Sequence, residues 1–171
     1  MKFRKNGDLI YGELTTQGIF DLIEHMKHNN MINKNSVFMD IGCGYGMVTK
    51  LVKDLLNIRT IGIELDPEKA KIATTITRWT IKDSKKVEIY SGSFVDYPEL
   101  INEATIIFSN CIAFNSEITE TLIKMIGNTV LIHNSEKITR SYCHLKQDRV
   151  LLPCTWSATI QPFYKMNTIN N

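Results

Sequence analysis

The stretch from residue 37 to residue 46, VFMDIGCGYG, limits the fold of this chain more than any other. Its first five positions are apolar except for Asp40, as expected for a short parallel strand covered on both faces. Residues 47–56 then have the apolar spacing of an amphipathic helix. Between strand and helix, a sharp turn and a close approach of the backbone to a ligand are allowed by three glycines, Gly42, Gly44 and Gly46. This order predicts a parallel α/β sheet with a ligand at the turn.

The next predicted strand indicates which ligand the turn holds. Residues 60–64, TIGIE, are apolar and β-branched and end in Glu64, about 20 residues after Gly42, where a ribose-binding carboxylate is expected. The dehydrogenase pattern G-x-G-x-x-G would require a glycine in place of Met47, and the phosphate-binding pattern G-x-x-x-x-G-K-[ST] is absent. Two acids, Asp40 and Glu64, suit a cationic sulfonium nucleoside better than a pyrophosphate. We therefore expect S-adenosyl-L-methionine as the cofactor, with a dinucleotide, or a glycine turn without a ligand, as alternatives.

Length and composition bound the class of protein. A chain of 171 residues is enough for one well-packed domain and too short for two ordinary ones. With 43% hydrophobic and 22% charged residues the composition is globular, and no apolar run has the length of a membrane span. The basic start, MKFRK, is not followed by an apolar segment, so we expect no secretory signal and an intracellular protein, in the cytoplasm or the nucleus. The four cysteines form no C-x-x-C pair, and His25 and His28 are expected to face solvent, so no metal site is predicted.

Strands and helices alternate along the rest of the chain. A helix begins at Thr15 or Thr16 and ends at the polar run 27–30; the other predicted helices cover 47–56, 66–81 (capped by Asp66) and 116–126 (capped by Ser116). The predicted strands cover 37–41, 60–64, 87–91, 105–108, 129–132, 149–152 and 158–166. No helical crossover separates the last two strands, so we expect them to form an antiparallel hairpin.

This order predicts an α/β fold, a Rossmann-like class I methyltransferase domain. We expect a seven-stranded, mostly parallel sheet with an antiparallel terminal hairpin and helices on both faces. One domain would cover residues 1–171, with a lid or lead-in at 1–14, a cofactor-binding core at 15–133, and a basic loop with the terminal hairpin at 134–171. Two loops fall at the carboxyl edge, where open α/β sheets bind ligands: 92–96 is a candidate base-recognition loop, and 109–114 is the expected reaction point.

Five motifs, in chain order, resemble those of the Dot-one (disruptor of telomeric silencing) lysine methyltransferases, which modify histones without a SET domain. The first and the last discriminate most, because the glycine turn and the following acid occur in most class I methyltransferases. The resemblance spans residues 11–114 and continues weakly in the terminal hairpin. The pairs are YGE at 11–13 with Y-G-E, DIGCGYG at 40–46 with D-L-G-S-G-x-G, GIE at 62–64 with G-[IV]-E, GSF at 92–94 with G-D-F, and IFSNCIAF at 107–114 with I-F-V-N-N-F-A-F.

The resemblance implies roles for the matching residues. The target lysine is expected in a narrow channel formed by Asn110, Phe114 and an aromatic residue of the terminal hairpin, Tyr164 or Trp156. Glu13 is expected near the ammonium group of the cofactor and Glu64 at its ribose. The implied cofactor contacts are Tyr11, Glu13, Asp40, Gly42, Gly44, Gly46, Glu64, Ser93, Phe94 and Asn110.

Three positions depart from the pattern of the family. Ser93 stands where the family has an adenine-contacting aspartate, a role that Asp96 could take. Cys111 and Ile112 replace an asparagine and an aromatic residue, which is expected to reshape the lysine channel.

These features predict an S-adenosylmethionine-dependent protein-lysine N-methyltransferase that acts on a histone or another basic protein. A small-molecule or RNA methyltransferase on the same fold is the alternative. Base methyltransferases carry a [DN]-P-P-[FYW] turn after the fourth strand, where this chain has SNCI, and an inactive scaffold would have lost Asp40, Glu64 or the glycines. The basic segment 137–149 could contact nucleic acid, although a solvated loop is favoured, and no membrane contact is expected.

Overall fold

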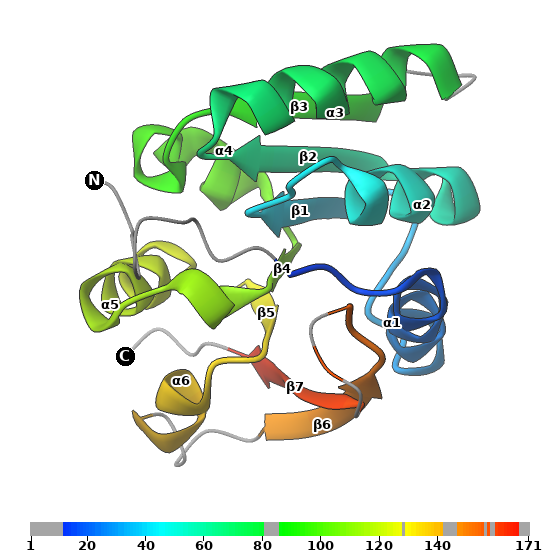
Figure 1. Ribbon diagram of the computed structural model, residues 1–171. Coiled ribbons are helices and arrows are strands. Elements are labelled where there is room, and N and C mark those ends of the chain that lie inside the picture. Colours follow the sequence, from blue (N-terminus) through cyan, green and yellow to red (C-terminus); the bar gives the residue numbers. More distant parts are fainter. Residues whose placement is uncertain are drawn as a thin grey trace.

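The computed structural model describes residues 12–80, 86–127, 129–141, 147–155, 157 and 160–167. The strands are β1 (Val37–Ile41), β2 (Arg59–Glu64), β3 (Val87–Ser91), β4 (Ile106–Ser109), β5 (Val130–His133), β6 (Gln147–Leu152) and β7 (Gln161–Asn167). They form one seven-stranded sheet in the order β3-β2-β1-β4-β5-β7-β6 (Figure 1). The first five strands pair in parallel, whereas β7 is antiparallel to both β5 and β6. The predicted sheet and its terminal hairpin are confirmed.

In the described part of the chain, six α-helices cover the two faces of this sheet (Figure 1). They are α1 (Thr16–His28), α2 (Met47–Leu56), α3 (Pro67–Thr80), α4 (Pro98–Glu103), α5 (Ser116–Met125) and α6 (Glu136–Ser141), with short 3₁₀ turns at Phe94–Asp96 and Cys111–Ala113. Helices α1 and α2 pack on one face, and α4, α5 and α6 on the other. None of the helices in the described part of the chain is long and apolar enough to cross a membrane.

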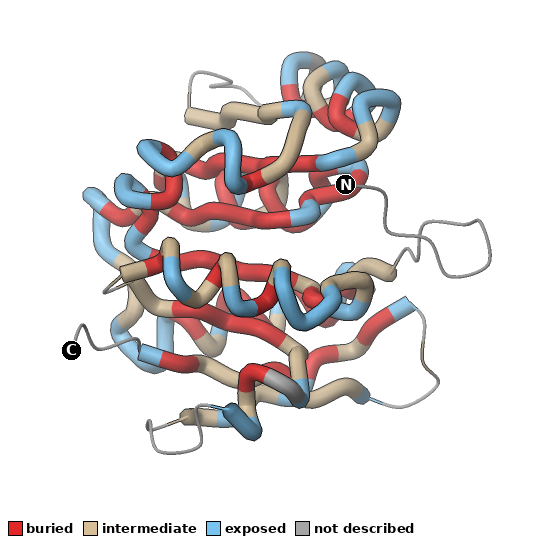
Figure 2. Tube along the Cα trace, turned by 90° about the vertical axis from the view of Figure 1, so that its left-hand side faces the viewer, coloured by how far each residue is buried: buried red, intermediate tan, exposed pale blue. Residues whose placement is uncertain are grey.

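Each face of the sheet has its own apolar core, and the central strands between them are buried (Figure 2). Under α1 and α2 the rings of Phe38, Phe108 and Phe163 stack across three strands, with centroids 6.5 Å and 5.6 Å apart. On the other face Leu122 and Ile138 are fully buried. Burial of such side chains contributes about 1.5–3 kcal/mol each, so the continuous apolar strands account for the sheet's central position.

Local side-chain hydrogen bonds determine where α1, α3 and α5 begin. Thr15 caps α1, because its hydroxyl accepts a hydrogen bond from the Gly18 N–H at 3.1 Å. The Asp66 carboxylate accepts from the Glu68 N–H at 2.9 Å at the start of α3. For α5 the cap is Asn115, whose side chain accepts from the Ile118 N–H at 3.0 Å, so the prediction of Ser116 as the cap was wrong by one residue.

The sequence did not predict α6, which lies in the segment expected to be a loop. The helix has only six residues, and most of its side chains are polar. Ile138 is its one fully buried apolar side chain, and it packs into the core beneath α4 and α5. A single apolar residue has no periodicity, so only the tertiary contact indicates this helix.

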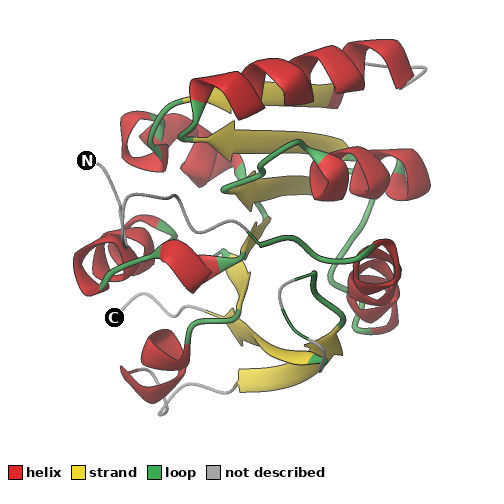
Figure 3. Cartoon of the chain, in the orientation of Figure 1, coloured by secondary structure: helices red, strands yellow, loops and turns green. Residues whose placement is uncertain are grey.

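The lead-in before α1 is tied to the segment that follows β6. Leu14 and Cys154 form an isolated antiparallel bridge, and the backbone N–H of Thr155 donates to the Glu13 carbonyl at 2.9 Å. The Thr15 N–H donates to the Pro153 carbonyl at 3.0 Å. Two segments about 140 positions apart in sequence are thereby joined, and Figure 3 shows the lead-in as a loop that runs across the sheet into α1.

Candidate active site

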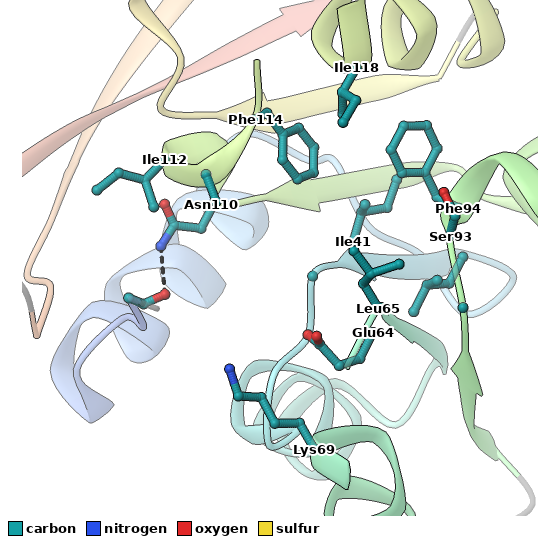
Figure 4. A pocket seen from close by; sticks show the side chains of 15 residues that line it. Ile41, Glu64, Leu65, Lys69, Ser93, Phe94, Asn110, Ile112, Phe114 and Ile118 are labelled. Carbon is teal, nitrogen blue, oxygen red and sulfur yellow. Dashed lines mark hydrogen bonds between the residues drawn. The ribbon is translucent and has the colours of Figure 1, made fainter. Parts of the chain in front are cut away.

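A cavity opens at the carboxyl edge of β1, β2 and β4, where Figure 4 shows its lining. The loops after these strands and after β3 supply most of the lining, and the strand ends, α3, α5 and the lead-in supply the rest. Its lining residues are Gly12, Ile41, Gly42, Ile63, Glu64, Leu65, Lys69, Gly92, Ser93, Phe94, Asn110, Ile112, Ala113, Phe114 and Ile118. A smaller cavity adjoins it and shares Gly12, Gly42 and Asn110, so the lead-in, the glycine turn and the loop after β4 border both.

The glycine turn is held against β2 by backbone hydrogen bonds. The N–H groups of Gly42 and Cys43 both donate to the Ile63 carbonyl, at 2.8 Å and 3.1 Å. Gly42 and Gly46 have φ values of +82° and +81°, a conformation that side chains rarely adopt. A Cβ on Gly42 would meet no atom within 4 Å, whereas one on Gly46 would lie 3.1 Å from the Ala73 Cβ of α3. Gly42 therefore leaves space at the cavity, and Gly46 allows α2 and α3 to approach.

The Glu64 carboxylate, at the end of β2, holds the glycine turn by a hydrogen bond. One carboxylate oxygen accepts from the Gly44 N–H and the other from the Asp66 N–H, both at 2.8 Å. Each carboxylate oxygen has a second lone pair, so the side chain can still accept hydrogen bonds from a ligand in the cavity. The carboxylate thus joins the glycine turn, the start of α3 and the cavity wall.

Two further carboxylates lie near Glu64 and border the smaller cavity. Asp40 is buried beneath the glycine turn, and its carboxylate accepts from the Thr49 hydroxyl at 3.2 Å. Burial, with a smaller contribution from the charges of Glu64 and Glu13, raises the pKa of Asp40 to about 7, although the Thr49 hydrogen bond acts in the opposite direction. Burial also raises the pKa of Glu13, against which the Tyr45 backbone N–H and the charge of Lys69 act. Three acids converging on one turn create a strongly negative potential that favours a cationic ligand.

The opposite wall of the cavity is apolar. The rings of Phe94 and Phe114 stack with centroids 6.1 Å apart, and Figure 4 shows them beside Ile118, across the cavity from Glu64 and Lys69. Leu65, directly after the β2 acid, is 41% exposed and contributes another apolar surface. The acids at the glycine turn, which border the smaller cavity and one side of the larger one, and the aromatic wall of the larger cavity suit a ligand with a cationic part and a planar apolar part.

Asn110 lies where the two cavities meet. Its side-chain amide donates to the Gly12 carbonyl at 2.8 Å, the bond drawn in Figure 4. Its carbonyl oxygen accepts from the side-chain amide of Asn134 at 2.5 Å, and Asn134 in turn accepts from the Cys111 N–H at 2.8 Å. The loops after β4 and β5 and the lead-in are therefore joined through one side chain.

The structure brings together most of the residues that the sequence singled out. Glu13, Asp40, Gly42, Glu64, Ser93, Phe94, Asn110 and Phe114 line one or both cavities, and Gly44 and Gly46 shape the turn. Tyr164 does not line either cavity in the described part of the chain; its ring lies 6.0 Å from that of His133 on β5. Tyr11 and Trp156 fall outside the described residues, as does part of the 137–149 segment. The hairpin side of the lysine channel stays a prediction.

Sequence reasoning missed Leu65, Lys69 and Asn134. The first two follow the β2 acid within one helical turn, so their position at the carboxyl edge could have indicated them. Asn134 directly follows β5 and had the same positional signal. His28 is exposed as expected, whereas His25 is half-buried, and burial lowers its pKa. Within the described residues, no group of three or more His, Cys, Asp or Glu side chains could hold a metal ion.

Comparison with known proteins identifies the family. The family model described as "Histone methylation protein DOT1" matches residues 1–141. The chain belongs to the DOT1 family. The resemblance drawn from the five motifs is thereby confirmed, and the matched range includes the lead-in, the glycine turn, Asn110 and Asn134.

Individual relatives agree with this family and fold. The chain is 29% identical over 126 residues to a histone-lysine N-methyltransferase, H3 lysine-79 specific, from Cryptococcus neoformans, a match that covers 67% of this chain and 19% of that protein. It is 32% identical over 73 residues to ribosomal RNA small subunit methyltransferase H from Crocosphaera subtropica, covering 42% of this chain and 22% of that protein. The chain spans about a fifth of the length of these curated relatives.

Solved structures share the fold. An RNA methyltransferase from Salinibacter ruber, solved with S-adenosyl-L-homocysteine, superposes with a TM-score of 0.64 at 17% identity, covering 88% of this chain and 92% of that one. The Rossmann-like class I methyltransferase fold predicted from the sequence is confirmed.

Proposed function

We propose that this chain binds S-adenosyl-L-methionine and transfers its methyl group to the ε-amine of a lysine in a protein, with histones as the first candidates. The observation that carries the proposal is the convergence of Glu13, Asp40 and Glu64 on the glycine turn. A sulfonium nucleoside with an amino-acid end is cationic at that position, whereas a dinucleotide would place a pyrophosphate among the three acids. Membership of the DOT1 family supports the same cofactor.

The two ends of the cavity suggest how the cofactor lies. When the cofactor is bound, Glu64 would accept hydrogen bonds from the ribose hydroxyls with its remaining lone pairs, and Leu65 and the Phe94 ring would hold the base. Asp40 and Glu13 would hold the methionine end, whose ammonium group would offset the buried charge of Asp40. Ser93 stands where the family has an aspartate. The apolar wall of the cavity does not require that aspartate, because Phe94, Phe114 and Ile118 form the wall.

Methyl transfer to a neutral amine requires little acid–base catalysis by the protein. When bound, the cofactor supplies an electrophilic methyl group for in-line displacement by a neutral amine. The residues of the chain must align that amine, exclude water and favour its neutral form. Asn110 lies at the border between the acidic turn and the loop that carries Ile112 and Phe114, where an approaching lysine would be desolvated by apolar side chains, which lowers its pKa. Tyr164 or Trp156 would complete the channel.

The substrate is the less constrained half of the proposal. The family description and the name of the Cryptococcus relative favour a histone, and an intracellular site of action, cytoplasmic or nuclear, goes with it. The names of the Crocosphaera and Salinibacter proteins favour RNA instead. The residues after β4, SNCI, lack the turn of base methyltransferases, so we place a protein substrate first.

One experiment separates these substrates. The purified chain is incubated with S-adenosyl-L-methionine labelled in the methyl group and, in parallel, with core histones, nucleosomes, a cell lysate, total RNA and duplex DNA. We expect label in protein that survives nuclease treatment and is recovered as methyl-lysine. A Glu64→Ala variant, which removes the hydrogen bonds from the Gly44 and Asp66 N–H groups, serves as the inactive control. Label recovered only in nuclease-sensitive material would replace the lysine proposal with a nucleic-acid one.

A further inference from the structure

Three loops of the active site are joined by a chain of hydrogen bonds in which each amide has one orientation. The Cys111 N–H donates to the Asn134 side-chain oxygen at 2.8 Å, the Asn134 amide donates to the Asn110 oxygen at 2.5 Å, and the Asn110 amide donates to the Gly12 carbonyl at 2.8 Å. The series begins at a residue next to Asn110 in the sequence and ends 98 positions before it.

The backbone groups at the two ends determine the direction of the series. A backbone N–H can only donate, so Asn134 must turn its oxygen to Cys111 and its amide to Asn110. A backbone carbonyl can only accept, so Asn110 must turn its amide to Gly12 and its oxygen to Asn134. The two requirements agree, and neither asparagine can be flipped without placing two donors or two acceptors against each other.

We propose that Asn134 is a positioning residue of the active site: it sets the orientation of the Asn110 side chain and, through Asn110, fixes the lead-in at Gly12 beside the cofactor cavity. The inference rests on the proposed function insofar as it gives Asn110 a place in the reaction. The geometry itself does not depend on which acceptor is methylated.

The consequence is a coupling between the cofactor side and the acceptor side of the site. Gly12 directly precedes Glu13, one of the three acids at the turn, and lines both cavities. Asn110 and Ile112 lie in one loop on the acceptor side. Release of Asn110 from Asn134 therefore loosens the lead-in as well as the loop, and both cofactor affinity and turnover decrease.

The orientation is tested in the ligand-free protein by nuclear magnetic resonance of the Asn110 side-chain amide, assigned by comparison with Asn110→Ala. Asn134→Asp keeps the acceptor for the Cys111 N–H and nearly the same shape but has no proton to donate to Asn110. Asn134→Ala removes both the oxygen that accepts from the Cys111 N–H and the amide that donates to Asn110. We expect the Asn110 amide resonances to shift in both variants. The exposed Asn35→Asp, with the same change of charge, should leave them in place. Unchanged Asn110 resonances in a folded Asn134→Asp protein would overturn the proposal.

Calorimetric titration with S-adenosyl-L-homocysteine then tests whether Asn134 acts through Asn110. Loss of the hydrogen bond to Asn110, in a partly buried site, predicts about tenfold weaker binding for Asn134→Ala. The double variant Asn110→Ala/Asn134→Ala should bind as weakly as Asn110→Ala alone, because the two side chains work in series. Additive losses, or full affinity in Asn134→Ala, would contradict the inference.

The two proposals can fail separately. If the native chain binds S-adenosyl-L-homocysteine but methylates no lysine, the proposed function is wrong. The affinities of the single and double variants still measure the coupling between Asn110 and Asn134. If the native chain does not bind it at all, the proposed function fails and the resonance test alone decides the role of Asn134. Far-ultraviolet circular dichroism identifies any variant that does not fold, and Asn134→Asp is the one whose shape changes least.

Discussion

Asp40 is a buried carboxyl group whose pKa differs strongly from that of the free amino acid. Burial raises its pKa from 3.8 to about 7, so between these values the folded chain holds a proton that the unfolded chain has lost. Stability is therefore greatest below about pH 4 as far as this group is concerned, and decreases by up to about 1.4 kcal/mol per pH unit as the pH rises to 7. Asp40→Asn should remove this slope, and the exposed Asp96→Asn should not. Urea unfolding from pH 5 to pH 8 measures both; a parallel decline in Asp40→Asn would contradict the assignment.

The same pKa predicts proton release when a cationic ligand binds. A positive charge beside Asp40 favours its ionised form, so the pKa decreases on binding and a proton leaves near neutral pH. Cofactor affinity should therefore rise from pH 5.5 toward pH 8 and level off above the pKa of the free protein. Calorimetry at pH 6.5 in buffers of different ionisation enthalpy measures the protons released. Proton uptake, or none, would mean that the cationic end of the ligand lies elsewhere.

Glu64 has a structural task as well as a binding one. Glutamine has one oxygen for the two backbone N–H donors of Gly44 and Asp66, so its amide would face one of them donor to donor. Loss of a charged hydrogen bond, at about 1.5–3 kcal/mol, predicts that Glu64→Gln binds S-adenosyl-L-methionine ten to a hundred times more weakly. The exposed Glu68→Gln at the start of α3 is the matched control. Equal affinities in calorimetric titrations would refute the assignment.

At the scale of elements, the contact between α1 and the segment after β6 requires a glycine at position 18. A Cβ on Gly18 would lie 2.2 Å from the Pro153 carbonyl oxygen, which is far inside van der Waals contact. In a helix, glycine to alanine otherwise stabilises by about 1 kcal/mol, so the sign of the change is diagnostic. We expect Gly18→Ala to destabilise the protein by about 1–3 kcal/mol and to weaken cofactor binding.

The neighbouring Thr16→Ala tests the helix alone, because Thr16 is exposed on the first turn of α1. Its midpoint of thermal unfolding should change little, while that of Gly18→Ala decreases. A Gly18→Ala protein that is more stable than the native chain would show that α1 and the Pro153 segment can separate without cost.

At the scale of the whole molecule, the lead-in before α1 is hydrogen-bonded to the segment that joins β6 and β7. Glu13 and Thr155 exchange backbone and side-chain hydrogen bonds at 2.9 Å and 3.1 Å, so the N-terminal segment and the terminal hairpin form one unit beside the cavity. Deletion of residues 1–13 removes Glu13 and the Gly12 carbonyl but neither apolar core. We expect cooperative unfolding to persist and cofactor binding to be lost.

A finer variant separates the lid from the fold. Thr155→Val keeps the shape and the backbone hydrogen bond but removes the hydroxyl that accepts from the Glu13 N–H. Cofactor affinity should decrease several-fold with little change in the unfolding midpoint, since a single partly exposed hydrogen bond contributes about 1 kcal/mol. If the chain without residues 1–13 binds the cofactor as tightly as the full chain, the lead-in is not part of the site.

The sequence by itself determined the strands and the longer helices, but not the short α4 and α6, and it placed the glycine turn and Glu64 at the carboxyl edge. Strand and helix patterns depend on residues within a few positions of each other, so α2 and β3 were predicted to the residue, and the order of elements was enough to predict the sheet. Glu64 and the glycines could be assigned for the same reason, because each belongs to a turn that joins adjacent elements.

Only the tertiary structure decided which loops meet. Asn110 contacts Gly12 and Asn134, which lie 98 and 24 positions away in the sequence, and α6 depends on one apolar contact with the core. No local sequence pattern specifies contacts between residues so far apart. Tyr164 lies opposite His133, because the antiparallel register of β7 against β5 pairs these two residues. Register and chain path come from burial over the whole sheet, which is why the acceptor side of the site could not be derived from sequence spacing.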